Sequence, residues 1–182
     1  MLAKPNSEVA PLLGRRIVMR LIEVEDAAFV ADLRADVRRN EHLSQASANV
    51  AAQAEWIGKY KLREQASEEF YFVIEDEKIP VGLVRIYGIE GGSFTWGSWI
   101  MKADAPAHCA IESALQVYEF AYGVLGLTHC HFEVRKGNER VWAFHERMGA
   151  TRVGEDDQQF FYHMPREAYL TARERYAKFL PS

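Results

Sequence analysis

The stretch 132–149, FEVRKGNERVWAFHERMG, constrains the fold of this chain more than any other. Residues 130–134 predict a short strand, and a lysine–glycine–asparagine turn follows it. An amphipathic pattern then predicts a helix from near Glu139 that ends at Gly149. One supersecondary unit therefore carries a strand carboxylate, a turn amide and a helix imidazole. These side chains belong to Glu133, Asn138 and His145.

The size and composition of the chain indicate an ordinary globular protein. At 182 residues it is long enough for one domain with a full core, and its 48% hydrophobic and 26% charged residues are typical of such domains. The net charge of -4 argues against a nucleic-acid partner, which would need a basic face. No apolar run approaches the roughly 20 residues that span a bilayer, so we expect no membrane association.

The N-terminal residues show no signal-peptide pattern, and we therefore expect a cytoplasmic protein. Two cysteines, Cys109 and Cys130, are consistent with a reducing compartment. Their spacing matches neither a metal site nor a disulfide framework, so we expect no metal. The sequence leaves open whether the protein is a monomer or a homodimer.

The order of predicted elements is strand, two helices, three antiparallel strands, helix, strand, helix, two strands and a terminal helix. Besides the unit described above, strands are predicted over 16–22, 70–75, 80–87, 94–101, 151–153 and 159–164, and helices over 27–39, 51–65, 107–125 and 166–179. This order predicts one α/β (α+β) domain whose mixed, mostly antiparallel sheet has helices on both faces. We expect an N-terminal arm over 1–13, the domain over 14–164 and a C-terminal helix over 165–182.

Residues 14–164 resemble the GCN5-related N-acetyltransferases, or GNAT family. The unit 132–149 is similar to the family's fourth-motif region, (L/F)EVR-x-x-N-x-x-(A/S)-x-x-x-Y-x-x-x-G-F. Residues 19–21 followed by Asp26, and the segment 42–56, resemble the branch that acts on ribosomal-protein N-termini and amino-sugar nucleotides. The resemblance implies acetyl transfer from acetyl-coenzyme A to a primary amine, on a peptide N-terminus, an amino sugar or another small metabolite.

The resemblance also implies catalytic roles. Glu133 lies where some family members carry a base that acts directly or through water; a solvated carboxylate or a partner for Arg135 is the alternative. His145 occupies the position of a tyrosine proposed to protonate the coenzyme A thiolate, and an imidazolium can do so near neutral pH. A surface histidine is its alternative. Asn138 is expected to cap the helix or to contact the pantetheine arm.

The expected cofactor loop departs from the family pattern. The resemblance places its glycine positions at Pro106, which has no N–H, and at His108, which lacks the freedom of glycine at positive φ. Either the N–H groups that open the following helix still bind the pyrophosphate, or coenzyme A binding is weakened or lost. The cofactor contacts that the resemblance implies are Ile100, Met101, Lys102, Ala107, His108, Cys109, Ala110, Asn138 and Arg140, with a backbone N–H near 100–102 stabilising the oxyanion.

A GNAT-fold interaction protein without activity is the rival interpretation, and the altered loop favours it. Candidate groups around an acceptor come from the first helices and the hairpin: Glu41, His42, Trp56, Arg85 and Tyr87. Trp96 and Trp99 are three residues apart on one predicted strand, so we expect them to face opposite sides of the sheet and to pack in the core.

Overall fold

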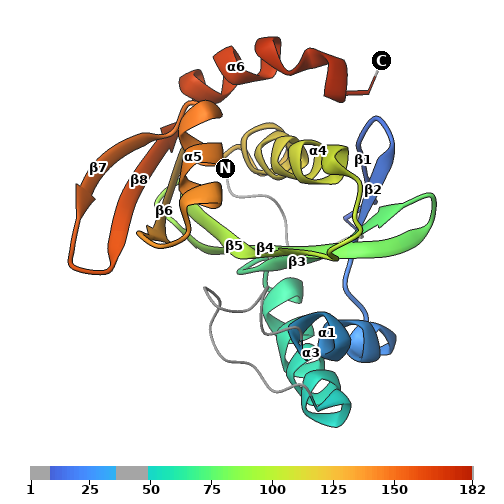
Figure 1. The fold of residues 1–182 in the computed structure, drawn as a ribbon. Helices are drawn as coiled ribbons and strands as arrows, with labels where there is room; N and C mark the ends of the chain where they lie inside the picture. The colour runs from blue at the N-terminus through green and yellow to red at the C-terminus, as the bar shows by residue number, and fades with distance from the viewer. Residues whose placement is uncertain (1–8, 36–48, 182) are drawn as a thin grey trace.

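The computed structural model describes residues 9–35 and 49–181 and shows one sheet between two layers of helices (Figure 1). Eight strands of these residues form the sheet, in the order β1-β2-β3-β4-β5-β6-β8-β7. All neighbours are antiparallel except β5 and β6, which confirms the predicted mixed sheet. The strands are β1 (Leu12–Leu13), β2 (Ile17–Leu21), β3 (Phe70–Asp76), β4 (Ile79–Glu90), β5 (Ser93–Met101), β6 (His129–Arg135), β7 (Thr151–Glu155) and β8 (Gln159–Pro165).

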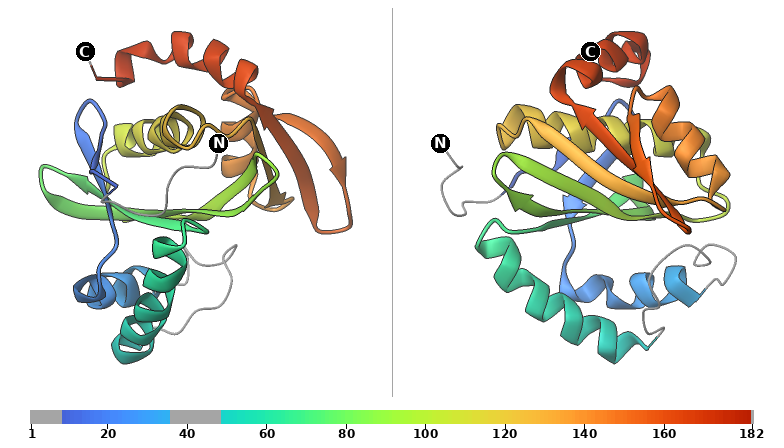
Figure 2. Two further views of the ribbon diagram at one scale, coloured as in Figure 1. Left: turned by 180° about the vertical axis from the view of Figure 1, so that it is seen from behind. Right: turned by 90° about the vertical axis from the view of Figure 1, so that its left-hand side faces the viewer.

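Helices cover both faces of the sheet, as the order of elements predicts (Figures 1 and 2). One face carries α1 (Ala27–Ala35) and α3 (Val50–Gln65), and the other carries α4 (Ala107–Tyr118), α5 (Glu139–Arg147) and α6 (Arg166–Arg175). The helix predicted over 107–125 leaves α-helical geometry at Tyr118 and continues as a π-helical turn over Glu119–Val124. Short 3-10 turns, Val24–Asp26 and Ala177–Phe179, precede α1 and follow α6.

The central strand β3 shows why its sequence is a continuous apolar run. Phe70, Phe72 and Ile74 point into the core under α4, whereas Tyr71 and Val73 point into the core over α1 and α3. All five are buried, because both faces of this strand are covered. Full burial of such side chains contributes about 1.5–3 kcal/mol each. The strand is therefore the common wall of both cores.

A β-bulge in β5 reverses one prediction. Leu83 pairs with Ile100 and Arg85 with Gly97, so β5 advances three residues while β4 advances two. The extra residue, Ser98, has a φ of 48°. The bulge resets the alternation of side chains. The two tryptophans consequently face α4 together, with ring centroids 5.2 Å apart, and the prediction that they face opposite sides is wrong. Trp96 donates to Tyr118 and Trp99 donates to Ser113.

The expected N-terminal arm ends inside the sheet, because Leu12–Leu13 pairs with β2 as the edge strand β1. One buried carboxylate ties this edge to α4. Glu112 has no exposed surface, and its Oε2 accepts hydrogen bonds from the backbone N–H groups of Arg16 (2.8 Å) and Ile17 (3.2 Å). Its Oε1 accepts a further hydrogen bond from the Arg16 guanidinium at 3.2 Å. The start of β2 thus depends on a side chain of α4.

Replacement of Glu112 should be costly. Glu112→Ala leaves two backbone N–H groups without an acceptor, and each such loss costs about 1–3 kcal/mol, so we expect a loss of about 3 kcal/mol in the free energy of unfolding. Glu112→Gln keeps one acceptor oxygen and should lose less. Urea denaturation measures the stability of both variants. Glu55→Gln, which breaks an exposed ion pair with Lys59, is the control and should change stability little. Equal stability of Glu112→Ala and wild type would contradict this role.

Candidate functional site

The parallel strands β5 and β6 diverge, and a cavity opens between them. They pair only at Ser93 with His129 and at Phe94 with Cys130. Beyond these pairs, β6, β8 and β7 turn away from the plane of β3–β5 (Figures 1 and 2). The cavity has a volume of about 350 Å³. Beyond Phe94 this edge of β5 pairs with no strand, and residues 95–99 line the cavity.

One part of the cavity, which we name the Glu133 wall, is lined by Arg85, Tyr87 and Glu133. Glu133 is exposed on β6, on the face opposite to its buried neighbours Phe132 and Val134. Burial raises the pKa of the Tyr87 hydroxyl; Arg85 opposes this shift and the Glu133 carboxylate adds to it. The Arg85 guanidinium lies 4.5 Å from the Tyr87 ring centroid.

The opposite wall is built around His145, whose side chain projects from α5 into an aromatic cage. Its ring centroid lies 4.3 Å from that of Phe132 and 5.1 Å from that of Trp96. The residue is only 4% exposed, and its Nδ1 is buried without a hydrogen-bond partner. It is therefore not a surface histidine; the cage and the cavity hold a polar atom that no described residue satisfies.

Burial also determines the charge of His145. Removal from water disfavours the imidazolium and lowers the pKa of His145 to about 3. The ring is consequently neutral at pH 7. The ring is thus not the imidazolium that the sequence suggested, because the sequence does not reveal that a polar residue of an amphipathic helix lies under Trp96 and Phe132. A neutral ring still offers one N–H donor.

Asn138 immediately precedes α5 and lines the cavity. Its backbone carbonyl accepts hydrogen bonds from the N–H groups of Val141 and Trp142, both at 3.1 Å. Its side chain makes no capping hydrogen bond, so the expected side-chain cap is wrong. The amide is therefore available to a ligand. Arg140 is exposed in the first turn of α5 and does not line the cavity.

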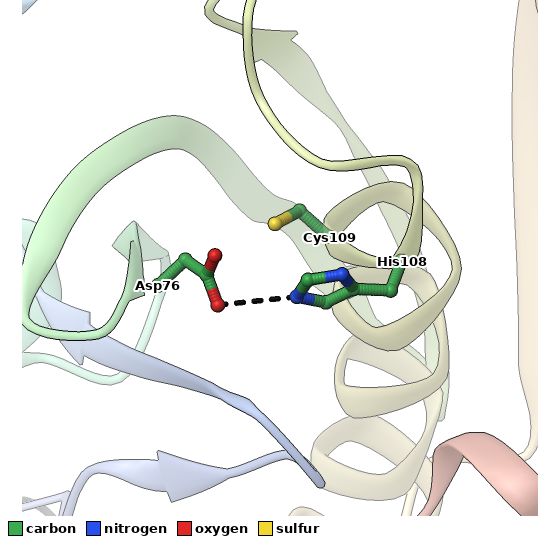
Figure 3. A group of neighbouring side chains, drawn as sticks. All are labelled: Asp76, His108 and Cys109. Atoms are coloured by element: carbon green, nitrogen blue, oxygen red, sulfur yellow. Dashed lines mark hydrogen bonds and ion pairs between the residues drawn. The ribbon is translucent and has the colours of Figure 1, made fainter.

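The first turn of α4 replaces the expected glycine loop. Pro106 is the residue before the helix, and its carbonyl accepts a hydrogen bond from Cys109 N–H at 3.0 Å. The His108 ring turns toward β3, where its Nε2 lies 3.1 Å from Oδ1 of Asp76 (Figure 3). Cys109 is buried, and burial, with Asp76 and Glu112 adding to it, raises the pKa of its thiol to about 11. Ala107 and Ala110 complete this turn.

The end of β5 lies apart from the cavity. Ile100 is buried in the core of α1 and α3, and Met101 pairs with Gly82 of β4. Lys102 donates its backbone N–H to Val81 and holds its ammonium 5.6 Å from the Phe29 ring centroid. The structure thus brings together Glu133, Asn138 and His145, whereas residues 100–102, 107–110 and Arg140 lie outside this cavity.

Sequence reasoning missed the part of the cavity that the bulge provides. Thr95, Gly97 and Ser98 line the cavity, and the signal for them is an isolated glycine inside a strand pattern. Of the candidate acceptor groups, Arg85 and Tyr87 line the cavity. Trp56 lies 5.8 Å from the Arg85 guanidinium, just behind this wall. Glu41 and His42 fall outside the described residues.

Comparison with known proteins identifies the family. The family model described as "Acetyltransferase (GNAT) domain" matches residues 16–151. The chain belongs to the GNAT acetyltransferase family. A solved relative, apo FdhC, described as a nucleotide-linked sugar GNAT, is 40% identical over 94% of this chain and 98% of its own, with a TM-score of 0.87. No curated protein matches the sequence of this GNAT chain.

More distant structures share the fold of this GNAT domain. Spermidine N-acetyltransferase from Vibrio cholerae, solved with CoA and spermine, has a TM-score of 0.74 at 18% identity, covering 85% of this chain and 98% of that one. A putative acetyltransferase from T. thermophilus has a TM-score of 0.77 at 18% identity, covering 98% of both chains. Among residues 9–35 and 49–181, no helix has the length and apolar character needed to cross a membrane.

The buried neutral His145 should make stability depend on pH. Its folded pKa of about 3 lies below its ordinary value of 6.5, so below pH 6.5 the unfolded chain takes up a proton that the folded chain does not. Wild type should therefore lose stability relative to His145→Phe as the pH falls, by up to about 1.4 kcal/mol per pH unit. Urea denaturation between pH 8 and pH 4 measures the difference. It should be constant above pH 7; a constant difference down to pH 4 would contradict the burial of the ring.

Proposed function

We propose that this GNAT protein transfers the acetyl group of acetyl-coenzyme A to a primary amine on a nucleotide-linked sugar. The observation that carries the proposal is the cavity between β5 and β6, which has a carboxylate on one wall and an unsatisfied neutral imidazole on the other. The 40% identity to FdhC supports the sugar-nucleotide acceptor over the peptide N-terminus that the sequence also allows.

The residues present fit a thioester co-substrate. The open edge of β5 offers peptide groups to a pantetheine arm, and the side-chain amide of Asn138 lacks a capping partner. The buried Nδ1 of His145 lacks a partner inside the same cavity. Acetyl-coenzyme A, when bound, supplies an activated acetyl group and a thiolate leaving group. The first turn of α4 offers helix N-terminal N–H groups to its pyrophosphate, in place of the glycine loop.

On the acceptor side, Glu133 is the proposed base. The attacking amine must lose a proton, and the exposed carboxylate accepts it directly or through one water. Tyr87 and Arg85 flank Glu133 and orient the acceptor. Because Glu133 and the histidine lie on opposite faces of β6, the amine and the thioester approach each other through the gap between the strands.

On the cofactor side, His145 acts as a neutral donor. A neutral imidazole does not protonate a thiolate, since it would become an imidazolate, but its N–H stabilises the negative charge that gathers on sulfur as the carbon–sulfur bond breaks. The oxyanion donor is proposed among the backbone N–H groups of the bulge at Gly97–Trp99. Lys102 N–H is unsuitable because Val81 already accepts its hydrogen bond.

Binding of acetyl-coenzyme A separates this proposal from the rival interaction protein. A ligand that binds only the folded chain at a hundredfold excess over its Kd stabilises the fold by about 2.7 kcal/mol, which raises the melting temperature by several degrees. We expect this rise with acetyl-coenzyme A and a smaller one with adenosine 3′,5′-bisphosphate, which lacks the pantetheine arm. No rise at millimolar acetyl-coenzyme A would favour the interaction protein.

Turnover should depend on both walls of the cavity. With a panel of nucleotide-linked amino sugars and N-terminal peptides, Glu133→Gln should lower kcat about 10²–10⁴-fold by removing the base. His145→Phe keeps the ring packing but removes the donor, and should lower kcat about 10²-fold. His131→Gln, on the same strand and face as Glu133 but outside the cavity, is the matched control and should retain kcat.

Unchanged kcat in both variants would exclude these residues from the chemistry. Turnover of peptides but not of nucleotide-linked sugars would leave acetyl transfer intact and reject the proposed acceptor. The first result would reject the catalytic roles of Glu133 and His145, whereas the second would reject only the nucleotide-linked sugar as acceptor.

A further inference from the structure

Three side chains that can bind a metal converge where α4 begins. Asp76 comes from the end of β3, and His108 and Cys109 come from the first turn of the helix (Figure 3). The Asp76 oxygen, a His108 ring nitrogen and the Cys109 sulfur all lie within 4.8 Å of one another. This site is separate from the cavity between β5 and β6, which none of the three residues lines.

The cluster is partly shielded from water but accessible from one side. The side chains of His108 and Asp76 are 14% and 17% exposed, whereas Cys109 lies fully buried behind them. The imidazole and the carboxylate therefore remain in contact with solvent, and the sulfur lies within 4.8 Å of both. Those two groups already point at each other, with Nε2 and Oδ1 3.1 Å apart.

The set of donor atoms selects the type of metal. One sulfur, one imidazole nitrogen and one carboxylate oxygen are the ligands that Zn²⁺ takes in tetrahedral sites. Magnesium and calcium prefer all-oxygen sites, which this cluster does not provide. A carboxylate and a thiolate also bring two negative charges, which balance the two positive charges of the ion.

We propose that Asp76, His108 and Cys109 bind a zinc ion, with a water molecule as the fourth ligand. On binding, zinc replaces the thiol proton of Cys109, which leaves to solvent, and takes the place of the hydrogen bond between His108 and Asp76. The ion thereby joins the end of β3 to the start of α4 by coordination bonds. The proposal can be tested without substrate, because the ion contacts side chains of the first turn of α4, whereas the proposed pyrophosphate contacts are its backbone N–H groups.

The test uses the full chain without a histidine tag, reduced and treated with a chelator. Zn²⁺ alone is titrated by calorimetry, and Co²⁺ alone is titrated by absorption. We expect one ion per chain, a rise in melting temperature with Zn²⁺, and a thiolate-to-cobalt charge-transfer band. Cys109→Ser should abolish that band, and Cys109→Ser, His108→Gln and Asp76→Asn should each weaken zinc binding more than tenfold, since even indirect supporting groups contribute about 10–100-fold.

Two controls make the result specific. Cys130→Ala removes the other buried cysteine and should retain the charge-transfer band and the zinc affinity. His163→Gln disrupts the His129–His163 pair on β6 and β8, whose rings lie 5.5 Å apart, and should retain zinc binding as well. Because His108 and Asp76 are partly exposed, their variants are expected to fold even if Cys109→Ser does not, and circular dichroism checks each variant.

Absence of zinc binding to wild type at micromolar concentrations would overturn the proposal. So would binding that His163→Gln abolishes and His108→Gln leaves unchanged, because the ion would then lie on the strand surface. A cobalt complex without a thiolate band would also overturn it, since Cys109 would not be a ligand.

Discussion

The divergence of β5 from β6 is the constraint on which the rest of the molecule depends. The strands pair at two positions and then separate. Residues of both strands beyond these pairs line a cavity, whereas in a continuous sheet they would pair with each other. The bulge at Gly97–Ser98 contributes by turning both Trp96 and Trp99 toward α4, where hydrogen bonds to Tyr118 and Ser113 fix them. The two tryptophan rings then pack against the His145 ring.

Burial gives the two walls of this cavity different chemistry. On one wall, the Glu133 side chain is exposed. On the other, the aromatic cage removes His145 from water and lowers its pKa, so we propose that the neutral ring acts as a hydrogen-bond donor rather than as an acid. In the proposed reaction, proton removal by Glu133 and stabilisation of the leaving group by His145 take place on opposite faces of β6.

Much of the fold could be predicted from local patterns. The alternation of apolar residues and the turn signals predicted the bounds of β3, β4 and α5 to within a few residues. The unit from Phe132 to Gly149 carries Glu133, Asn138 and His145, which line one cavity. The sequence could not reveal the charge of His145, because that depends on Trp96, distant in sequence. It could not reveal the partner of His108 either, since Asp76 lies 32 residues away on another strand.

The central claim is that acetyl-coenzyme A occupies the cavity between β5 and β6, and a steric block tests it most directly. Val141 lines the cavity from α5, and Val141→Trp should fill part of its roughly 350 Å³. Val153→Trp places the same side chain on exposed β7 and is the matched control. Calorimetric titration with coenzyme A should show binding to wild type and to Val153→Trp, and greatly weakened binding to a folded Val141→Trp. Equal affinity of all three proteins would contradict the account.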